Sequence, residues 1–407
     1  MEARQNVAGI DVHKRMLAVV VGRAGQTERE WQRRKFGTTT QELRHLAAWL
    51  QHNQVEEVAL ESTAQYWKPV WIELEGSFRL NLAQARSNKG AKGRKSDFRD
   101  AVRIIKRLLA DDLTLSYVPD AEQRRWRAMT RGKQQLTQDR VRLQSQIEAL
   151  LEEGQIKLSS VVSDLLGASG YRILRALARG ESDVEKLADF ADVRLQVGRS
   201  GLMDALSGQL HQVHRKLLGL ALDRLNLIEQ QMEELDQQIS QAMQGHNQAI
   251  VRLCGLPGLG VGSAQQIVAE MGPEAATFPS ASQAASWVGV CPGREESAGE
   301  SKSNRSPKGN RQMRRLLNQL AWAAVKAKDS YFQHLFRRLV PKLGIKKAIW
   351  AVAHRLLKLI WKVLHQKVDY IEHGPVALDE RARNRRKQRL LRELRRMGYA
   401  VQLAPAA

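Results

Sequence analysis

The sequence predicts an α/β domain at the N-terminus followed by all-α segments. Short β-type runs alternate with amphipathic helical stretches as far as about residue 118. Two long polar stretches then carry apolar residues spaced by three and four, as in paired helices. Gly, Pro and Ser are frequent in the next part, and further helical stretches follow. These patterns divide the 407 residues into segments 1–118, 119–245, 246–370 and a basic tail, 371–407.

The N-terminal segment reads as three strands, a helix, a strand, a helix, a strand and a helix. Strand runs are rich in Val, Ile and Leu, whereas the helices place apolar residues on one face. In the last helix this face carries Ala101, Ile104 and Ile105. Such an order predicts a mixed sheet. In chain order we expect strands at 7–11, 16–21 and 31–36, a helix at 39–51, a strand at 55–60, a helix at 67–74, a strand at 78–85 and a helix at 97–110.

The two long helical stretches, 123–154 and 202–243, admit two interpretations. They could pair as an antiparallel hairpin inside one chain, or they could form a dimerisation arm. Periodicity alone does not distinguish the two, because it does not identify the partner helix. Residues 155–200 between them are expected to form a small helical insert. Helices are also expected at 311–326 and 346–365.

A glycine-rich segment, 253–262, lies between helical stretches and resembles a helix-hairpin-helix. In that motif the turn brings backbone N–H groups close to a phosphate, and the next helix N-terminus adds a favourable dipole. A dinucleotide-binding fingerprint does not fit, because Ser263 breaks the glycine spacing. A plain turn between two helices remains an alternative. On the first interpretation, Gly258 and Gly260 contact a nucleic-acid backbone.

The charge of the chain points to a polyanionic partner. Lys and Arg number 65 and Asp and Glu 43, so the net charge is +22, and nucleic acid is the leading candidate. With Cys254 and Cys291 as the only cysteines, a disulfide framework and a Cys-based zinc site are excluded. The N-terminus has no apolar signal core, and charged residues interrupt the apolar stretch 348–364. We therefore expect no membrane span and a cytoplasmic protein.

Four acidic residues stand where strands end and a helix begins. Asp11 ends the first strand, Glu61 follows the strand 55–60, and Asp97 and Asp100 share the first turn of a helix. Because these positions can converge at one sheet edge, the four carboxylates would repel one another unless cations neutralise them. Oxygen ligands of this kind suit Mg²⁺ or Mn²⁺, and two such ions can support phosphoryl transfer. Each acid taken alone is usually only solvated.

Three motifs carry a resemblance to a known family. Gly9-Ile10-Asp11-Val12-His13-Lys14, Leu60-Glu61-Ser62-Thr63 and 93–101, Gly-Arg-Lys-Ser-Asp-Phe-Arg-Asp-Ala, resemble the DEDD transposases of bacterial insertion sequences. The resemblance covers nearly the whole chain. It implies an RNase H-like (RuvC-like) first domain in which Asp11, Glu61, Asp97 and Asp100 bind the metal. Ser96 departs from the Thr usual in the third motif, which leaves the aspartates in place.

The same family carries a nucleophilic serine in a Ser-Gly-type motif of its C-terminal domain. Ser297 is the best match, although this chain has Ser-Ala-Gly there, and Ser301, Ser303 and Ser306 are the alternatives. A serine hydroxyl is a weak nucleophile that needs activation, which a metal site acting on the phosphate could help to supply. The resemblance further implies donor and target DNA, a guide (bridge) RNA, a dimer or tetramer with a composite site, and a location at the bacterial nucleoid.

Basic residues surround both sets of candidate catalytic residues. Nine Lys or Arg lie between residues 86 and 107, seven between 294 and 315, and nine in the tail between 381 and 396. Such clusters suit phosphate contacts, which fix position without reading sequence. The tail is expected to hold RNA or to act as an electrostatic tether. The nucleic-acid-binding residues that we predict are Lys92, Arg94, Lys95, Gly258, Gly260, Arg294, Lys302, Arg305 and Lys308.

Three other functions remain as alternatives. A structure-specific DNA nuclease of the resolvase type would need the four acids but not Ser297. A non-catalytic nucleic-acid-binding protein would need only the basic surfaces and the glycine turn. A sugar-kinase-like enzyme also opens with a strand ending in Asp, but it needs glycine-rich phosphate loops, and residues 1–118 contain none.

Overall fold

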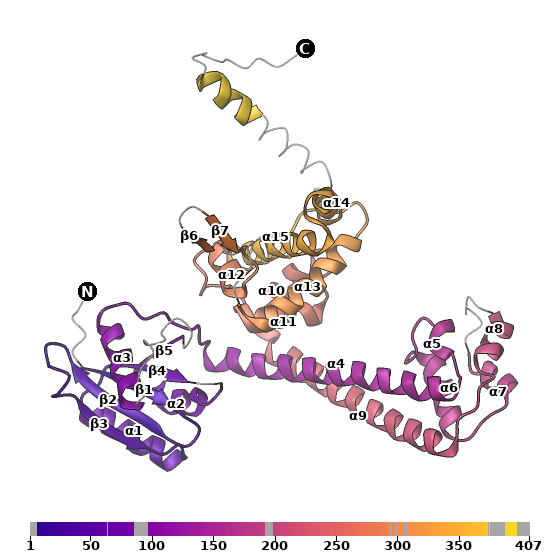
Figure 1. Ribbon diagram of the computed structural model, residues 1–407, viewed down its shortest axis with the longest axis horizontal. Helices are drawn as coiled ribbons and strands as arrows, with labels where there is room; N and C mark the ends of the chain where they lie inside the picture. The colour runs from indigo at the N-terminus through magenta and orange to yellow at the C-terminus, as the bar shows by residue number, and fades with distance from the viewer. Residues whose placement is uncertain are drawn as a thin grey trace. The chain divides into compact units, whose positions relative to one another are not determined.

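The computed structural model describes residues 6–62, 64–84, 97–191, 198–292, 295–297, 300–303, 306, 308–372, 374 and 387–396. The chain divides into two compact units, Met1–Pro119 and Asp120–Ala407 (Figure 1). The first unit is an α/β domain, and the described part of the second is almost entirely helical. The predicted fold class, α/β followed by all-α, agrees with this division of secondary structure.

The first unit contains a five-stranded mixed sheet in the order β3-β2-β1-β4-β5. β1 is antiparallel to β2 and parallel to β4. At the two edges of the sheet, β3 is antiparallel to β2 and β5 is parallel to β4. The predicted mixed sheet is therefore confirmed. The last strand is shorter than the predicted 78–85, because beyond it Ala83 forms only an isolated bridge with Leu115. The strands are β1 (Asn6–Val12), β2 (Leu17–Arg23), β3 (Gln32–Phe36), β4 (Glu57–Ser62) and β5 (Arg79–Leu82).

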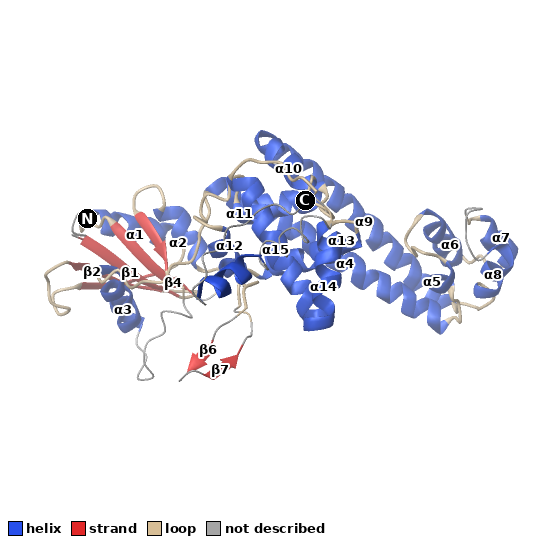
Figure 2. Ribbon diagram, turned by 90° about the horizontal axis from the view of Figure 1, so that it is seen from above, coloured by secondary structure: helices blue, strands red, loops and turns tan. Residues whose placement is uncertain are grey.

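Helices cover both faces of this sheet. α1 (Thr40–His52) and α2 (Trp67–Leu74) lie on one face, and α3 (Asp97–Leu109) lies on the other (Figure 2). Because side chains alternate along a strand, one set of strand residues packs with α1 and α2 and the other with α3. Ile10 and Leu60 belong to the first core, and Val7 and Ala59 belong to the second. The α3 face is the one that carries the acidic residues described below.

In the second unit, two long helices form an antiparallel hairpin inside one chain (Figure 1). They are α4 (Ala121–Glu153) and α9 (Gln212–Ala242). Ion pairs join Lys133 to Asp236, Arg140 to Glu229, and Glu153 to His214, so residue numbers rise along one helix as they fall along the other and the two helices are antiparallel. The intrachain interpretation is confirmed. Buried Leu143, Ile147, Leu222 and Leu225 form the seam.

The predicted single helix over 202–243 is wrong, because the structure divides this stretch. α8 (Gly198–Ala205) ends before a turn, and α9 begins at Gln212 after the N-cap His211. The reason is contact with the end of α4: a side chain at Gly208 would collide with the backbone of Gly154 and Gln155. The predicted helical insert is present as α5 (Leu158–Val161), α6 (Ala168–Ala178), α7 (Val184–Asp189) and α8.

The remaining helices pack around α15, which is apolar on the sides that contact its neighbours. α10, α12, α13 and α14 all contact it, and Ala348, Val352, Leu356 and Ile360 are completely buried. Within the described residues, no helix combines the length and the apolar character needed to cross a bilayer. The sequence patterns did not predict α14. The elements are η1 (Gln244–His246), α10 (Asn247–Cys254), α11 (Val261–Met271), α12 (Ala281–Val288), β6 (Glu295–Ser297), β7 (Glu300–Ser303), α13 (Arg311–Lys326), α14 (Tyr331–Leu343) and α15 (Ile345–His365); residues 387–396 are helical as well.

Candidate active site

Two neighbouring parallel strands of the first unit present acidic residues side by side. Asp11 of β1 and Glu61 of β4 are direct partners in the strand register. Both side chains belong to the set that faces α3, because Val7 on β1 and Ala59 on β4 pack in the α3 core at even spacing from them. The side chain of Asp11 is 13% exposed and that of Glu61 is 16% exposed. The sheet register therefore places two carboxylates together at a partly shielded edge.

Helix α3 reaches this edge because position 9 lacks a side chain. A Cβ at Gly9 would overlap the carbonyl oxygen of Ala101 and lie 2.8 Å from the side chain of Ile105. α3 begins at Asp97, so Asp97 and Asp100 lie in its first turn, where negative charge also interacts favourably with the helix dipole. The close contact of helix and strand carries these two aspartates to Asp11.

His13 links the strand end to the helix start. Its Nε2 lies 3.1 Å from Oδ2 of Asp11 and 3.6 Å from Oδ1 of Asp97. Ligand atoms of Asp11, His13 and Asp97 all lie within 4.8 Å of one another. Lys35 of β3 adds an ammonium group 3.4 Å from Oδ2 of Asp97. These positive or potentially positive groups offset part of the local negative charge.

Arg103 joins the other two acids. Its guanidinium forms an ion pair with Asp100, one turn earlier on α3, and lies 3.3 Å from Oε2 of Glu61. Its Nε is buried and has no hydrogen-bond partner among the described residues. The guanidinium therefore lies between the carboxylates of Asp100 and Glu61 and offsets part of their charge. Together these contacts bring all four predicted acids, Asp11, Glu61, Asp97 and Asp100, to one edge of the sheet.

The acids affect one another electrostatically. Burial raises the pKa of the Asp11 carboxyl, and the charges of Asp100 and Asp97 raise it further, while His13 opposes the rise. Burial also raises the pKa of Glu61, against the opposing effect of Arg103, and Asp11 and Asp100 add to the rise. A carboxylate with a raised pKa is one whose charged form is insufficiently compensated. A bound cation would remove this imbalance.

The donor set fits a divalent cation. Mg²⁺ and Mn²⁺ prefer carboxylate oxygens, which the four acids supply. Asp11, Asp97 and His13 could hold one ion directly, and Glu61 and Asp100 could take part once Arg103 moves aside. The four acids were predicted from their places at strand ends and a helix start. His13, Lys35 and Arg103 received no role from the sequence; only the spacing of Arg103, three residues after Asp100, could have signalled a contact.

The predicted phosphate-binding residues next to the site, Lys92, Arg94 and Lys95, lie outside the described residues. Other cations of the same basic run are engaged with carboxylates. Lys106 pairs with Glu28 at 2.6 Å, and Arg107 pairs with Asp112 at 3.1 Å. Part of the basic run in 86–107 therefore balances acids of its own domain.

The predicted nucleophile lies in the second unit, on a two-stranded hairpin (Figure 2). Along the chain this hairpin follows α12 and precedes α13. Ser297 ends β6 and is the register partner of Glu300 on β7. Ser301, Lys302 and Ser303 lie on β7. Ser306 is half-buried and Lys308 is exposed, whereas Arg294 and Arg305 lie outside the described residues. Three of the four candidate serines, Ser297, Ser301 and Ser303, therefore lie on one short hairpin, and Ser306 follows it.

The glycine turn joins α10 to α11, and the two helices contact each other. Gly258 has φ +80°, and a Cβ there would lie 2.7 Å from the backbone N of Ala324 on α13. The glycine at this position is therefore explained by packing inside the unit. Gly260 caps α11, is exposed and has open space around it, so this N-terminus remains accessible to a phosphate.

Comparisons with known proteins agree with this arrangement. Residues 8–155 match the model of the IS110-type DEDD transposase domain, described as a transposase. Residues 251–337 match a second model, described as the transposase IS116/IS110/IS902 family. A probable family 20 transposase of Pseudomonas aeruginosa is 26% identical over 325 residues, which cover 77% of this chain and 85% of that protein. The chain therefore belongs to the DEDD transposases of insertion sequences and is a DNA-processing enzyme.

Proposed function

We propose that the protein cuts and rejoins DNA by metal-dependent phosphoryl transfer, with Ser297 as the nucleophile. The observation that carries the proposal is the convergence of Asp11, Glu61, Asp97 and Asp100 at one sheet edge, with pKa values of Asp11 and Glu61 raised by burial and mutual repulsion. Mg²⁺ or Mn²⁺ bound by these acids would polarise the scissile phosphate and stabilise the leaving oxygen.

The residues of the chain have distinct parts in this reaction. The Ser297 hydroxyl oxygen attacks phosphorus, a serine–phosphorus ester forms, and the bond from phosphorus to one sugar oxygen breaks. The serine proton goes to water, and the departing sugar oxygen becomes a hydroxyl. The phosphoserine ester keeps the energy of the broken bond, so a second sugar hydroxyl can displace the serine and rejoin the strand without ATP.

The acids and the serine belong to different units of the chain, and the family resemblance implies a composite site built from two protomers. The same resemblance implies a structured guide RNA that pairs with donor and target DNA. The net charge of +22 supports a nucleic-acid partner of either kind. Phosphates would be held by exposed Lys308, by Lys302 of β7 and by the accessible α11 N-terminus at Gly260. With DNA as its substrate, the protein is expected at the nucleoid.

An excision assay in cells tests the proposal. The gene with its native flanks is placed on a plasmid, and the circular junction product is amplified and sequenced. We expect junctions from the wild type and none from Asp11→Ala or Ser297→Ala, although both variants fold and bind DNA. Junctions from Ser297→Ala would show that another serine, or a metal-only mechanism, is used.

A hydrolytic nuclease is the second candidate, because the four acids alone suffice for it. The two functions differ in their products. A recombinase that uses Ser297 leaves protein covalently attached to DNA, which is detected after denaturation on a gel. A nuclease leaves only free cut ends, and Ser297→Ala would not change its rate. A protein that only binds DNA would give neither product, and Asp11→Ala would have no effect.

A further inference from the structure

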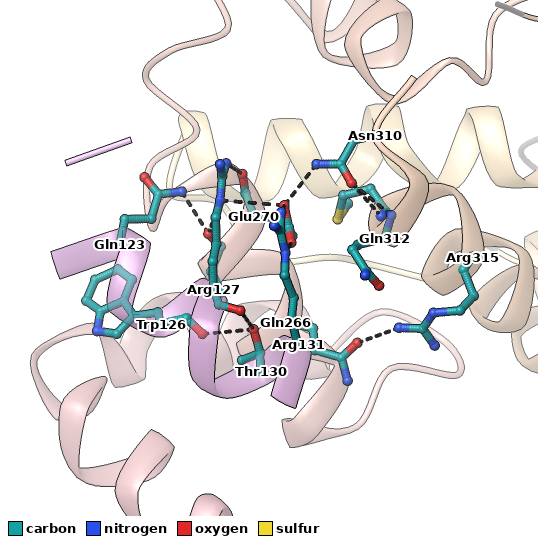
Figure 3. A network of polar contacts seen from close by, with 12 residues as sticks. Gln123, Trp126, Arg127, Thr130, Arg131, Gln266, Glu270, Asn310, Gln312 and Arg315 are labelled. Atoms are coloured by element: carbon teal, nitrogen blue, oxygen red, sulfur yellow. Dashed lines mark hydrogen bonds and ion pairs between the residues drawn. The ribbon is translucent and has the colours of Figure 1, made fainter. Parts of the chain in front are cut away.

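A buried carboxylate joins three elements of the second unit. Glu270, near the end of α11, is 3% exposed. Arg131 of α4 binds it with two hydrogen bonds, from Nε to Oε1 at 2.7 Å and from Nη2 to Oε2 at 2.9 Å. Arg127, one turn earlier on α4, places its Nε 3.5 Å from Oε2 (Figure 3). Because a buried charge is costly without partners, Glu270 strongly favours one placement of α4 against α11.

The third partner of the Glu270 carboxylate is the residue at which the serine-bearing segment ends. Asn310 donates from Nδ2 to Oε2 of Glu270 at 2.9 Å. Its Oδ1 accepts the N–H groups of Gln312 and Met313, both at 3.0 Å, and so caps α13. Its own N–H donates to the carbonyl oxygen of Trp287 at 3.1 Å. A single side chain therefore fixes the start of α13 and the end of the segment that carries Ser297.

The start of that segment is fixed at the same place. A Cβ at Gly309 would overlap the backbone of Val288 and Gly289, so the returning chain lies directly on the end of α12. Arg314 of α13 donates to the carbonyl oxygen of Gly289. The two ends of the segment 290–308 are thus held together, and Asn310 connects this closed base to Glu270 and to α4.

We propose that Glu270 and Asn310 are positioning residues that hold the base of the β6–β7 hairpin in register with α4. The inference rests on the proposed role of this hairpin in strand transfer. Neither side chain needs to touch DNA: their hydrogen bond sets the direction in which the hairpin leaves the helical body. A nucleophile displaced by about 1 Å reacts about 100-fold more slowly, so a lost bond at the base would be visible in the reaction rate.

A reciprocal pair of substitutions tests the bond itself. In Asn310→Asp the α13 cap is kept, because Asp is as good an N-cap as Asn, but the donor to Glu270 is lost and a second carboxylate faces it. In Glu270→Gln the charge that balances Arg127 and Arg131 is lost. The double variant, E270Q with N310D, exchanges the amide and the carboxylate between the two positions and restores both the hydrogen bond and the cluster's charge. Glu274→Gln, which breaks an exposed pair with Lys367, is the matched control.

Three measurements on the full-length protein separate the outcomes: junction yield in cells, hydrogen exchange of the β6 and β7 amides, and thermal unfolding. We expect each single variant to lower junction yield about 10- to 100-fold and to speed exchange in β6 and β7. The double variant should recover to within about tenfold of the wild type, and Glu274→Gln should match the wild type. A loss of junction yield at a temperature well below the variant's Tm is the readout that a merely structural role would not give, and recovery in the double variant assigns that loss to the bond between the two side chains.

Two results would overturn the inference: Asn310→Asp with wild-type junction yield and exchange, or a double variant no better than the worse single variant. If Glu270→Gln does not fold, Asn310→Asp still decides, since it leaves the arginine pairs of Glu270 in place. A failure of the proposed nucleophile looks different. Ser297→Ala would then keep its activity while the exchange pattern and its recovery persist, and the positioning role would apply to another residue of the hairpin.

Discussion

At the scale of single residues, we expect Asp11, as a proposed metal ligand, to link stability to metal binding. Burial and neighbouring carboxylates raise the pKa of Asp11 in the folded state, so the protonated carboxyl favours folding. This contribution to the free energy of unfolding is fully present below the unfolded-state pKa and is lost as pH rises through the folded-state pKa. We expect Asp11→Asn without metal to be more stable than wild type at pH 8, by a few degrees in Tm, and to lose this advantage near pH 4. Thermal unfolding in a chelator, repeated across pH, measures this.

Added Mg²⁺ should raise the Tm of the wild type and leave that of Asp11→Asn unchanged, because a ligand stabilises only the state that binds it. Asp112→Asn serves as control, since Asp112 is an exposed acid of the same domain. Equal responses of wild type and Asp11→Asn to Mg²⁺ would remove Asp11 from the metal site.

Gly9 offers a steric test of the same site. Gly9→Ala should force α3 away from β1, destabilise the domain by about 1–3 kcal/mol and abolish junction formation, because the new methyl group would overlap Ala101. Gly76→Ala is the control, because a Cβ there meets nothing within 4 Å. Chemical denaturation and the excision assay are compared for both; a fully active Gly9→Ala would contradict the packing argument.

Some residues of the candidate site could be predicted from the sequence and others could not. Their places at strand ends and a helix start made Asp11, Glu61, Asp97 and Asp100 candidates, and the motifs that resemble the DEDD transposases singled them out. His13 and Arg103 were not assigned. Their contacts with Asp97 and Glu61 depend on how closely α3 lies on the sheet, which is set by the absent side chain at Gly9. Gly258 was predicted to contact a nucleic-acid backbone; the structure shows in addition that a side chain there would collide with α13, which periodicity could not reveal.

At the scale of elements, the α4–α9 hairpin is held by its apolar seam. Leu225 is fully buried in this seam and Leu227, two residues on, is 54% exposed. Leu225→Ala should therefore cost about 2–4 kcal/mol of unfolding free energy, while Leu227→Ala should stay within about 0.5 kcal/mol. Urea unfolding followed by circular dichroism compares them. Equal effects would mean that the two faces of α9 are buried alike, as in an additional helical contact.

Element order and type were predicted well wherever the apolar period was regular. The helices at 67–74 and 311–326 have the predicted bounds, and the strands of the sheet shift by only a few residues. The break between α8 and α9 was missed because it depends on a long-range contact: the chain at Gly208 lies on the end of α4. The register between β1 and β4 could not be predicted from the apolar period either, because it is fixed by hydrogen bonding between the two strands.

At the scale of the whole molecule, we expect the positive charge to set the affinity for nucleic acid. The helical part of the tail, 387–396, carries five Lys or Arg and one acid, Glu393. Replacing those five cations by Gln should weaken RNA binding and lower the slope of log K against log salt by about 0.7 for each lost phosphate contact. Titrations at several salt concentrations measure the slope. Unchanged affinity and slope would show that the tail does not contact RNA.

The closed base of the β6–β7 hairpin has a consequence for the length of the segment that it encloses. The chain leaves the helices at Val288 and returns at Gly309, and these two positions are in backbone contact. The placement of α12 against α13 therefore does not depend on how many residues lie between them. We therefore expect this stretch to tolerate changes in length without loss of the helical scaffold. A laboratory graft of a foreign hairpin between these two positions would then alter strand-transfer chemistry and leave the scaffold's melting behaviour untouched.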